Sequence, residues 1–273
     1  FLRHYNPSDY MIERLKNEDM LQKLDMSKIT NYDLIDEKYK NLYFDENNEY
    51  SVPYTGGRVG IIYNKTMVKE TVDSWDILWD QKYKGNILMF DNSRDAFGIA
   101  LQKLGYSQNT TDEKQLEEAA AALKEQKPLV QAYVMDQIFD KMGNGEAALA
   151  PYYAGDAITM MDENSDLGYA VPKEGTNRFV DAMVIPKGAP NKDNAEKFIN
   201  FICETDVAKE IVEYIGYSTP HQEAYEQLDD EIKSNPIAYP SEDVLKNTEF
   251  FVNLPSDVNK KMQDLWVEIK TSK

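Results

Sequence analysis

The sequence predicts an α/β protein. Helical and strand signals alternate along the chain, and no proline-rich or glycine-serine linker divides it. Hydrophobic residues make up 42% of the 273 residues, and 18 Tyr, 10 Phe and 3 Trp can build a large core, so disorder is not expected. If there are two domains, ordinary strands connect them and the chain crosses more than once. Such an arrangement creates a cleft and a hinge.

The first half of the chain places a helix before a series of strands and helices. Apolar residues at helical spacing predict a helix over 10–23. The stretch SVPYTGGRVGIIYN (51–64) indicates a strand, a Gly-Gly turn or hinge, and a second strand. The apolar run at 87–90 predicts a strand that leads into a helix starting near Ala96. A capping box, an apolar face and a Lys-Pro stop predict the clearest helix over 110–127.

The second half continues the alternation. ALAPYY (148–153) and FVDAMVIP (179–186) indicate strands. Residues 193–203 predict a helix that is apolar on one side. A second helix is predicted over 206–215, and Gly216 is placed to end it.

Charge and cysteine content restrict the function. The formal net charge of −18 argues against nucleic acid or an anionic membrane surface as a partner, and weakly favours cationic partners. Cys203 is the single cysteine, so the sequence predicts no disulfide framework and no cysteine-based metal site within one chain. The longest apolar runs are strand-sized, so no transmembrane helix is predicted, and the first residues lack the pattern of a signal peptide.

Motifs for catalysis are missing. The two histidines, His4 and His221, lie far apart in the sequence, and no HExxH, GxSxG, P-loop or GxGxxG pattern is present. The sequence therefore predicts a protein that is not an enzyme and has no cofactor. A glycosidase that uses paired carboxylates, for example Asp91 and Asp95, is kept as an unfavoured alternative.

Carboxylates and aromatic residues occur together at the ends of predicted strands. A polar cluster, DNSRD (91–95), follows one strand where a helix begins, a position at which open α/β sheets bind ligands. Tyr153 ends another strand, and Phe179 and Asp181 share one side of a third because side chains alternate. Aromatic faces attract a cation and carboxylates pair with its charge, so this combination suits an alkyl-ammonium ligand.

Five segments closely resemble one protein family, the spermidine/putrescine-binding proteins of bacterial polyamine ABC importers. They are PSDYMIERL (7–15), SWDILWDQKYKGNILMFD (74–91), ALQKLGYSQNTTD (100–112), VDAMVIPKGAPNKDNAEKFINFI (180–202) and DVAKEIVEYIGYSTP (206–220). The resemblance covers nearly the whole chain. It implies a type II periplasmic-binding-protein fold with two lobes, a hinge and a polyamine in the cleft. It also implies a membrane permease and an ATPase as partners.

The resemblance also implies boundaries and ligand contacts. Lobe 1 is expected to comprise residues 1–57 and 182–226, and lobe 2 residues 58–181 and 227–273. The residues that match ligand-binding positions of the family are Ser8, Tyr10, Asn92, Asp95, Tyr153, Phe179, Asp181, Tyr217 and Phe251.

Two of these positions depart from the family pattern. Asn92 is an amide where family members often have an acid, so charge pairing at that end is expected to be weaker. Phe251 stands where some members have glutamine, and it lacks that hydrogen bond. The choice between spermidine and putrescine stays open.

The start of the chain departs from the family more seriously. Family members carry a further segment, with an apolar strand running into PSxY, whereas Asn6 occupies the last position before Pro7. We therefore expect lobe 1 to be incomplete at its N-terminus. We also expect the chain either to associate with itself by strand exchange or to bind ligand weakly.

Other expectations concern a second ligand and the location. Tandem tyrosines, Tyr152 and Tyr153, leave a ferric-ion-binding protein of the same fold as an alternative, because phenolates can ligate iron. The family implies a periplasmic protein, or an extracellular lipoprotein in a Gram-positive host, with signal and anchor not present in this chain.

Overall fold

The computed structural model describes residues 5–272, and the chain divides into two compact units. Unit 1 contains the chain up to Gly57, Arg178–Pro240 and Phe250–Asn253. Unit 2 contains Arg58–Asn177, Ser241–Glu249 and the chain from Leu254 onward. Compact units are defined by internal contacts, whereas lobes are bodies that move, so the predicted lobe boundaries stay a prediction.

Three strands continue from one unit into the other. They are β1 (Ser51–Asn64), β6 (Thr176–Val184) and β7 (Thr248–Phe250). In the sheet, β1 is the neighbour of β6, and β6 is the neighbour of β7.

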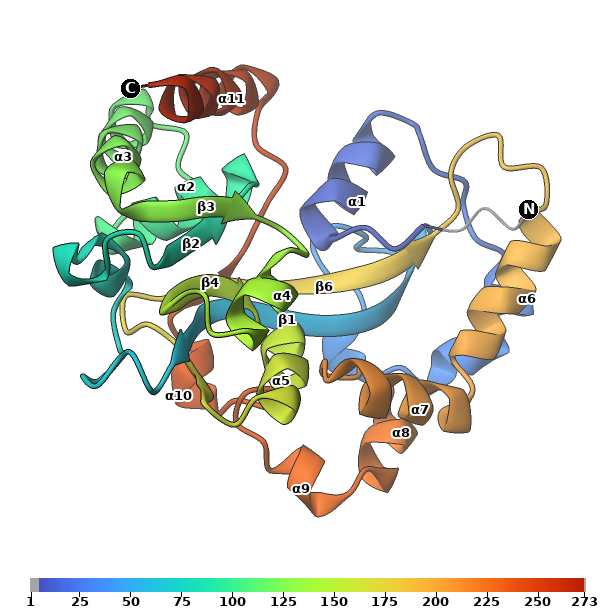
Figure 1. Ribbon diagram of the computed structural model, residues 1–273. Coiled ribbons are helices and arrows are strands. Elements are labelled where there is room, and N and C mark those ends of the chain that lie inside the picture. Colours follow the sequence, from blue (N-terminus) through green and yellow to red (C-terminus); the bar gives the residue numbers. More distant parts are fainter. Residues whose placement is uncertain (1–4, 273) are drawn as a thin grey trace. The chain divides into compact units, whose positions relative to one another are not determined.

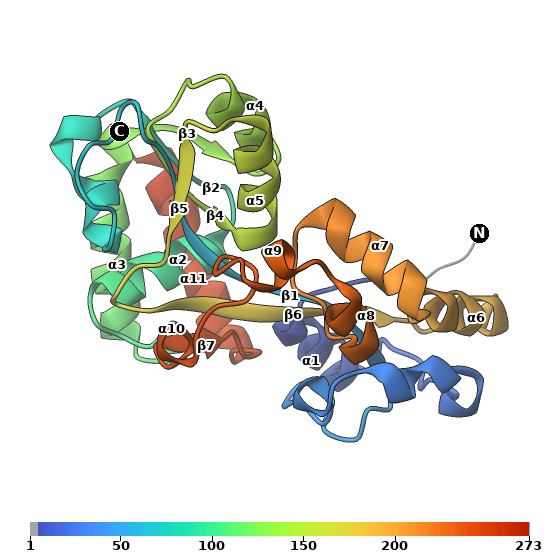
Figure 2. The same ribbon diagram turned by 90° about the horizontal axis from the view of Figure 1, so that it is seen from below.

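Unit 2 is built on strands in the order β3-β2-β4-β1, and β5 also pairs with β1. β2 pairs in parallel with β3 and β4, whereas β1 pairs antiparallel with β4 and β5. Figure 2 shows α2, α3 and α11 on one side of these strands and α4 and α5 on the other. The strands are β2 (Ile87–Phe90), β3 (Val130–Val134), β4 (Leu149–Tyr153) and β5 (Leu167–Ala170). The α-helices are α2 (Ser93–Lys103), α3 (Glu113–Gln126), α4 (Ile138–Gly143), α5 (Ala154–Glu163), α10 (Glu242–Leu245) and α11 (Ser256–Thr271). Short 3-10 helices are η4 (Trp75–Trp79), η5 (Gln81–Tyr83) and η6 (Lys127–Leu129).

Unit 1 packs its helices around β6 and the first half of β1, as Figure 1 shows for α6 and α1. Its α-helices are α1 (Asp9–Asn17), α6 (Lys192–Ile202), α7 (Thr205–Ile215), α8 (Gln222–Gln227) and α9 (Asp230–Lys233). Its 3-10 helices are η1 (Met26–Lys28), η2 (Thr30–Leu34) and η3 (Glu37–Tyr39).

Two apolar clusters cover the two faces of β6. Alternate residues of the strand, Val180, Ala182 and Val184, pack with Ile12 and others in one cluster. Met183 belongs to the second cluster, which also contains residues of α6. Because side chains alternate along a strand, Phe179 and Asp181 emerge on the face of Met183. The packing of β6 therefore determines on which face the predicted ligand residues lie.

The α/β alternation predicted from the sequence is confirmed, and three local predictions are wrong. The first helix ends at Asn17 rather than at residue 23. β1 is one continuous strand of 14 residues, so the Gly-Gly pair does not break it. The helix α3 is capped by Asp112, whose carboxylate accepts two backbone N–H groups, and not by the predicted capping box. Gly216 ends α7 as predicted, with φ 71°, a value that glycine adopts without steric cost.

The chain before α1 lies along β6. Tyr5 forms an antiparallel bridge with Val184, and Ser8 forms one with Asp181. Pro7, which has no N–H group, accepts a hydrogen bond from the backbone of Ala182 at 3.2 Å. This pairing fixes the start of α1 against the strand that carries Asp181. The predicted incompleteness of lobe 1 and the predicted strand exchange stay predictions.

Candidate functional site

Ser8 and Asp181, 173 residues apart, meet in unit 1. The Ser8 hydroxyl donates to Oδ1 of Asp181 at 2.8 Å, and both residues are half buried. Ser8 precedes α1 but makes no side-chain capping bond, because its hydroxyl is directed to Asp181. The carboxylate is thus oriented by a donor from the neighbouring segment.

Phe179, which shares a face of β6 with Asp181, is in contact with a second aromatic ring. The centroids of Phe179 and Tyr217 are 6.3 Å apart, with an angle of 59° between the rings. Gly57 makes room for both, because a Cβ there would lie 2.7 Å from Cζ of Phe179 and 3.2 Å from Cδ1 of Tyr217. Gly57 therefore allows the two rings to approach the backbone of β1 closely and does not form a turn. Burial, followed by the charge of Asp181, raises the pKa of Tyr54.

Tyr10 and Phe251 are in edge-to-face contact in unit 1, with centroids 5.7 Å apart and rings at 89°. The carbonyl of Phe251, a residue only 4% exposed, accepts a hydrogen bond from the Tyr43 hydroxyl. The backbone N–H of Asn253 donates to the carboxylate of Glu13 at 2.8 Å. These bonds fix the short segment Phe250–Asn253 to the rest of unit 1.

Asp9 is a buried carboxylate next to two predicted ligand residues, and the sequence analysis did not single it out. Its side chain is fully buried, Oδ1 accepts the N–H of Tyr10 at 2.7 Å, and Oδ2 accepts the N–H of Val180 at 3.2 Å. An aspartate in the first turn of a helix is usually exposed, and its charge interacts favourably with the helix dipole. The only available signal was its place between Ser8 and Tyr10 in the PSDY motif.

Asn92, Asp95 and Tyr153 come together in unit 2. Asn92 caps α2, since its side-chain oxygen accepts the N–H of Arg94 at 2.9 Å and of Asp95 at 3.4 Å. Oδ2 of Asp95, a residue 7% exposed, accepts the Tyr153 hydroxyl at 3.1 Å. Burial raises the pKa of Asp95 to about 6, against the opposing effects of the Tyr153 hydrogen bond and the Arg94 charge.

Tyr153, which donates to Asp95, belongs to a cluster of three rings with Phe90 and Tyr152. The centroid of Phe90 lies 5.5 Å from that of Tyr152 and 5.1 Å from that of Tyr153. Tyr152 is 2% exposed, and burial, more than the nearby acidic groups, raises the pKa of its hydroxyl. A phenolate is therefore disfavoured at Tyr152 in the metal-free protein, and the ferric-ion alternative stays a prediction.

Asp91 lies apart from this arrangement. It is exposed and forms an ion pair with Lys270 of α11. Asp95 is buried and bonded to Tyr153. The two carboxylates proposed for a glycosidase are therefore engaged with different partners. Among residues 5–272, no group of three or more His, Cys, Asp or Glu side chains could hold a metal ion.

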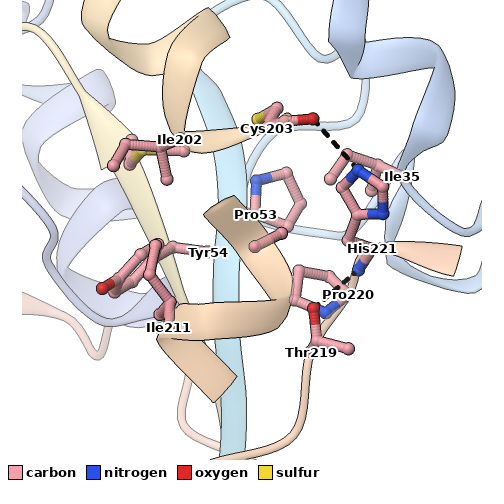
Figure 3. Close-up of a pocket in the computed structure, with 11 residues that line it drawn as sticks. Ile35, Pro53, Tyr54, Ile202, Cys203, Ile211, Thr219, Pro220 and His221 are labelled. Atoms are coloured by element: carbon pink, nitrogen blue, oxygen red, sulfur yellow. Dashed lines mark hydrogen bonds between the residues drawn. The ribbon is translucent and has the colours of Figure 1, made fainter. Parts of the chain in front are cut away.

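A pocket in unit 1 contains none of the nine predicted ligand residues. It is lined mainly by apolar side chains and by His221 (Figure 3). Nε2 of His221 lies 3.0 Å from the carbonyl of Cys203, and Nδ1 accepts the N–H of Ala224 at 3.1 Å, which caps α8. Burial raises the pKa of the Cys203 thiol to about 12, so this cysteine is inert at neutral pH. The pocket offers no carboxylate to a cation.

The geometry is that of a binding protein. Carboxylates lie beside aromatic rings and are oriented by hydroxyl groups, in an α/β fold. In the part of the chain from Tyr5 to Ser272, no helix is long and apolar enough to cross a membrane.

The comparisons with known proteins agree with this class. A model of the family described as bacterial extracellular solute-binding protein matches residues 7–248. The spermidine/putrescine-binding periplasmic protein of Escherichia coli is 39% identical over 245 residues, covering 89% of this chain and 70% of the relative. A structure titled as a putative spermidine/putrescine ABC transporter from Listeria monocytogenes is 40% identical, with a TM-score of 0.95, over 99% of this chain and 84% of the other. The spermidine/putrescine ABC transporter substrate-binding protein PotD of Streptococcus pneumoniae, in complex with calcium and HEPES, is 39% identical, with a TM-score of 0.85, over 98% and 83% of the two chains.

The chain belongs to the family of bacterial extracellular solute-binding proteins. The predicted resemblance to the spermidine/putrescine substrate-binding proteins of ABC transporters is confirmed, and so is the α/β periplasmic-binding-protein fold. Membership of a solute-binding family also confirms that the chain is not an enzyme.

Proposed function

We propose that this protein is the substrate-binding component of an ABC importer and captures a polyamine, spermidine or putrescine. The proposal depends mainly on one observation: each compact unit holds a carboxylate that accepts a hydroxyl hydrogen bond and lies in an aromatic environment. The pairs are Ser8 with Asp181 and Tyr153 with Asp95. An ammonium group of a polyamine needs such a carboxylate as its partner.

The chemistry of the two pairs fits an alkyl diammonium ion. An unpaired ammonium group is costly to bury, so a carboxylate is required for each charged end. Rings such as Phe179 and Tyr153 can cover the methylene groups and contribute about 0.5–2 kcal/mol for each cation–π contact. The predicted ligand set of nine residues stays a prediction. Asn92 is the member with the clearest local role, because its side-chain oxygen already caps α2.

Isothermal titration calorimetry with putrescine and spermidine tests the proposal. We expect saturable binding of both polyamines and none of 1,4-butanediol, which has the length of putrescine without its charges. Asp230→Ala is the matched control for removal of a negative charge, because the Asp230 side chain is fully exposed in unit 1. No heat and no thermal shift with either polyamine at millimolar concentration would contradict the assignment.

The partners and the location follow from the same proposal. We propose that the permease and ATPase of an ABC importer receive the ligand, and that the protein acts outside the cytoplasmic membrane, in the periplasm or as a lipoprotein. Strand-exchanged self-association remains a separate prediction, which sedimentation velocity would test.

A further inference from the structure

Ser218 binds β1 at Gly56 in unit 1. The two residues form an antiparallel bridge, in which the N–H of Gly56 donates to the carbonyl of Ser218 at 3.0 Å and the N–H of Ser218 donates to the carbonyl of Gly56 at 3.2 Å. The Ser218 hydroxyl donates to the same Gly56 carbonyl at 2.7 Å, and this contact is buried. A buried hydroxyl needs a hydrogen-bond partner, and this one uses its proton to reinforce the bridge. The side chain therefore supplies one of the three hydrogen bonds between the two residues.

The two glycines of β1 allow close contacts on opposite faces of the strand. A Cβ atom at Gly56 would lie 3.2 Å from Oγ of Ser218. A Cβ atom at Gly57 would lie 2.7 Å from Cζ of Phe179 and 3.2 Å from Cδ1 of Tyr217. Because side chains alternate along a strand, the hydroxyl occupies one face and the two rings occupy the other. Glycine weakens the interior of a strand, and here each of the two glycines has a packing reason.

Tyr217 is held from both sides along the chain. Gly216 directly precedes it and ends α7 with φ 71°, and Ser218 directly follows it. The ring of Tyr217 then lies with its centroid 6.3 Å from that of Phe179. Phe179 belongs to β6, which is the neighbour of β1 in the sheet. Without the Ser218 hydroxyl, the backbone next to Tyr217 would be tied to β1 only by the two backbone bonds of an isolated bridge.

We propose that Ser218 and Gly57 are positioning residues for the ring pair of Phe179 and Tyr217. Ser218 fixes the backbone next to Tyr217, and Gly57 leaves the space in which the two rings are in contact. Neither residue needs to touch the ligand. Rings that are held in place before binding lose less conformational freedom when a ligand packs on them, so the arrangement favours affinity. This inference rests on the proposed function, because it takes the ring pair as part of the polyamine site.

The hydroxyl is tested by Ser218→Ala, with putrescine as the probe in calorimetry. We expect the affinity to fall about three- to tenfold, as for the loss of one hydrogen bond. The same substitution in a Tyr217→Ala protein should change the affinity by less than about twofold, because the ring that it positions is gone. A merely structural role of Ser218 would lower the affinity by the same factor in both proteins.

The space at Gly57 is tested independently by Gly57→Ala. The added methyl group cannot lie 2.7 Å from Cζ of Phe179, so the ring has to move, and we expect the affinity for putrescine to fall on the order of tenfold. In a Phe179→Ala protein the nearest atoms are absent. Gly57→Ala should then lower the affinity by less than about threefold further, because only the looser contact with Tyr217 remains.

Ser234→Ala is the matched control for loss of a serine hydroxyl. Ser234 is exposed in unit 1, and its hydroxyl also donates to a backbone carbonyl, that of Glu231 at 3.3 Å. This variant should bind putrescine as the wild type does. Circular dichroism and thermal unfolding establish that each variant is folded.

The outcomes separate the inference from the proposed function. Wild-type affinity in a folded Ser218→Ala protein, or equal losses with and without the Tyr217 ring, overturns the role of Ser218 and leaves the proposed function intact. If Ser218→Ala does not fold, the Gly57 series decides: a loss from Gly57→Ala that is as large without Phe179 as with it overturns the inference. A wild-type protein that binds neither putrescine nor spermidine overturns both.

Discussion

Asp9 in unit 1 and Asp95 in unit 2 are both buried aspartates in the first turn of a helix, but they have different neighbours. Asp9 receives two backbone N–H groups and lies near the like charge of Asp181. Asp95 receives one hydroxyl and lies near the opposite charge of Arg94. Burial raises both pKa values, to about 7 and about 6. Desolvation therefore sets the direction at both sites, and the sign of the neighbouring charge contributes to the difference between them.

Replacing Asp181 should have the largest effect on putrescine binding. It also removes the negative charge that lies near Asp9 and has no counterpart near Asp95. We expect Asp181→Ala to weaken putrescine binding by about 2–5 kcal/mol, since an ammonium group loses its partner. Phe179→Ala should cost only about 0.5–2 kcal/mol through the lost cation–π contact. Calorimetry on both variants checks this order, and the reverse order would argue against pairing at Asp181.

Removing the hydroxyl that faces Asp95 tests the comparison from unit 2. Tyr153→Phe should lower the free energy of unfolding by about 1.5–3 kcal/mol at pH 8, where Asp95 is ionised and receives a hydrogen bond as a charged acceptor. The loss should shrink as the pH falls below the Asp95 pKa of about 6, because the bond then no longer stabilises a charge. Urea unfolding at pH 8 and pH 5 measures both values. An equal loss at both pH values would assign the effect to packing.

The pKa of His221 in unit 1 is shifted downward, whereas the pKa values of Asp9 and Asp95 are shifted upward. Burial lowers its pKa, so the neutral ring is favoured in the folded protein, and stability is lost as the pH falls below the unfolded value of about 6.5. The raised pKa of Asp9 acts the other way, since stability falls as the pH rises from about 4 toward 7.

His221→Gln should therefore weaken the loss of stability between pH 7 and pH 5. Removal of the Nδ1 cap should itself cost about 0.5–2 kcal/mol at pH 7. Thermal unfolding across this pH range checks both effects. A variant with the wild-type pH profile would exclude His221 as the titrating group.

Asn92→Asp should have the smallest effect on stability and makes the two sites more alike. Asp and Asn are equally good helix caps, so the unfolding free energy should change by less than about 0.5 kcal/mol. The added carboxylate should raise the pKa of Asp95 further, as like charges do, and strengthen putrescine binding at pH 8. Nuclear magnetic resonance titration of the Asp95 carboxyl carbon reports the first effect. An unchanged midpoint would show that the two carboxyl groups do not interact.

The sequence analysis singled out some residues of the candidate site and gave no signal for others. Asp181 and Phe179 were predicted as ligand residues because alternation in a strand and the family motif both point to them, and their role stays a prediction. Asp95 was predicted from its position after an apolar strand. The contacts of Asp9 with Val180 and of Tyr43 with Phe251 were not predicted, because the partners are 171 and 208 residues apart in the chain. No local pattern contains such contacts.

The sequence by itself determined the fold class, the family and the types of side chain available to a cation. Those properties follow from hydrophobic periodicity and from short sequence motifs, which involve residues close together in the chain. The tertiary structure alone decided which carboxylates are buried and which groups face them. Ser8 gives its hydroxyl to Asp181 rather than to its own helix, and Asp9 is withdrawn from water by β6. Burial and neighbouring charge set a pKa, and both arise only when distant segments pack together.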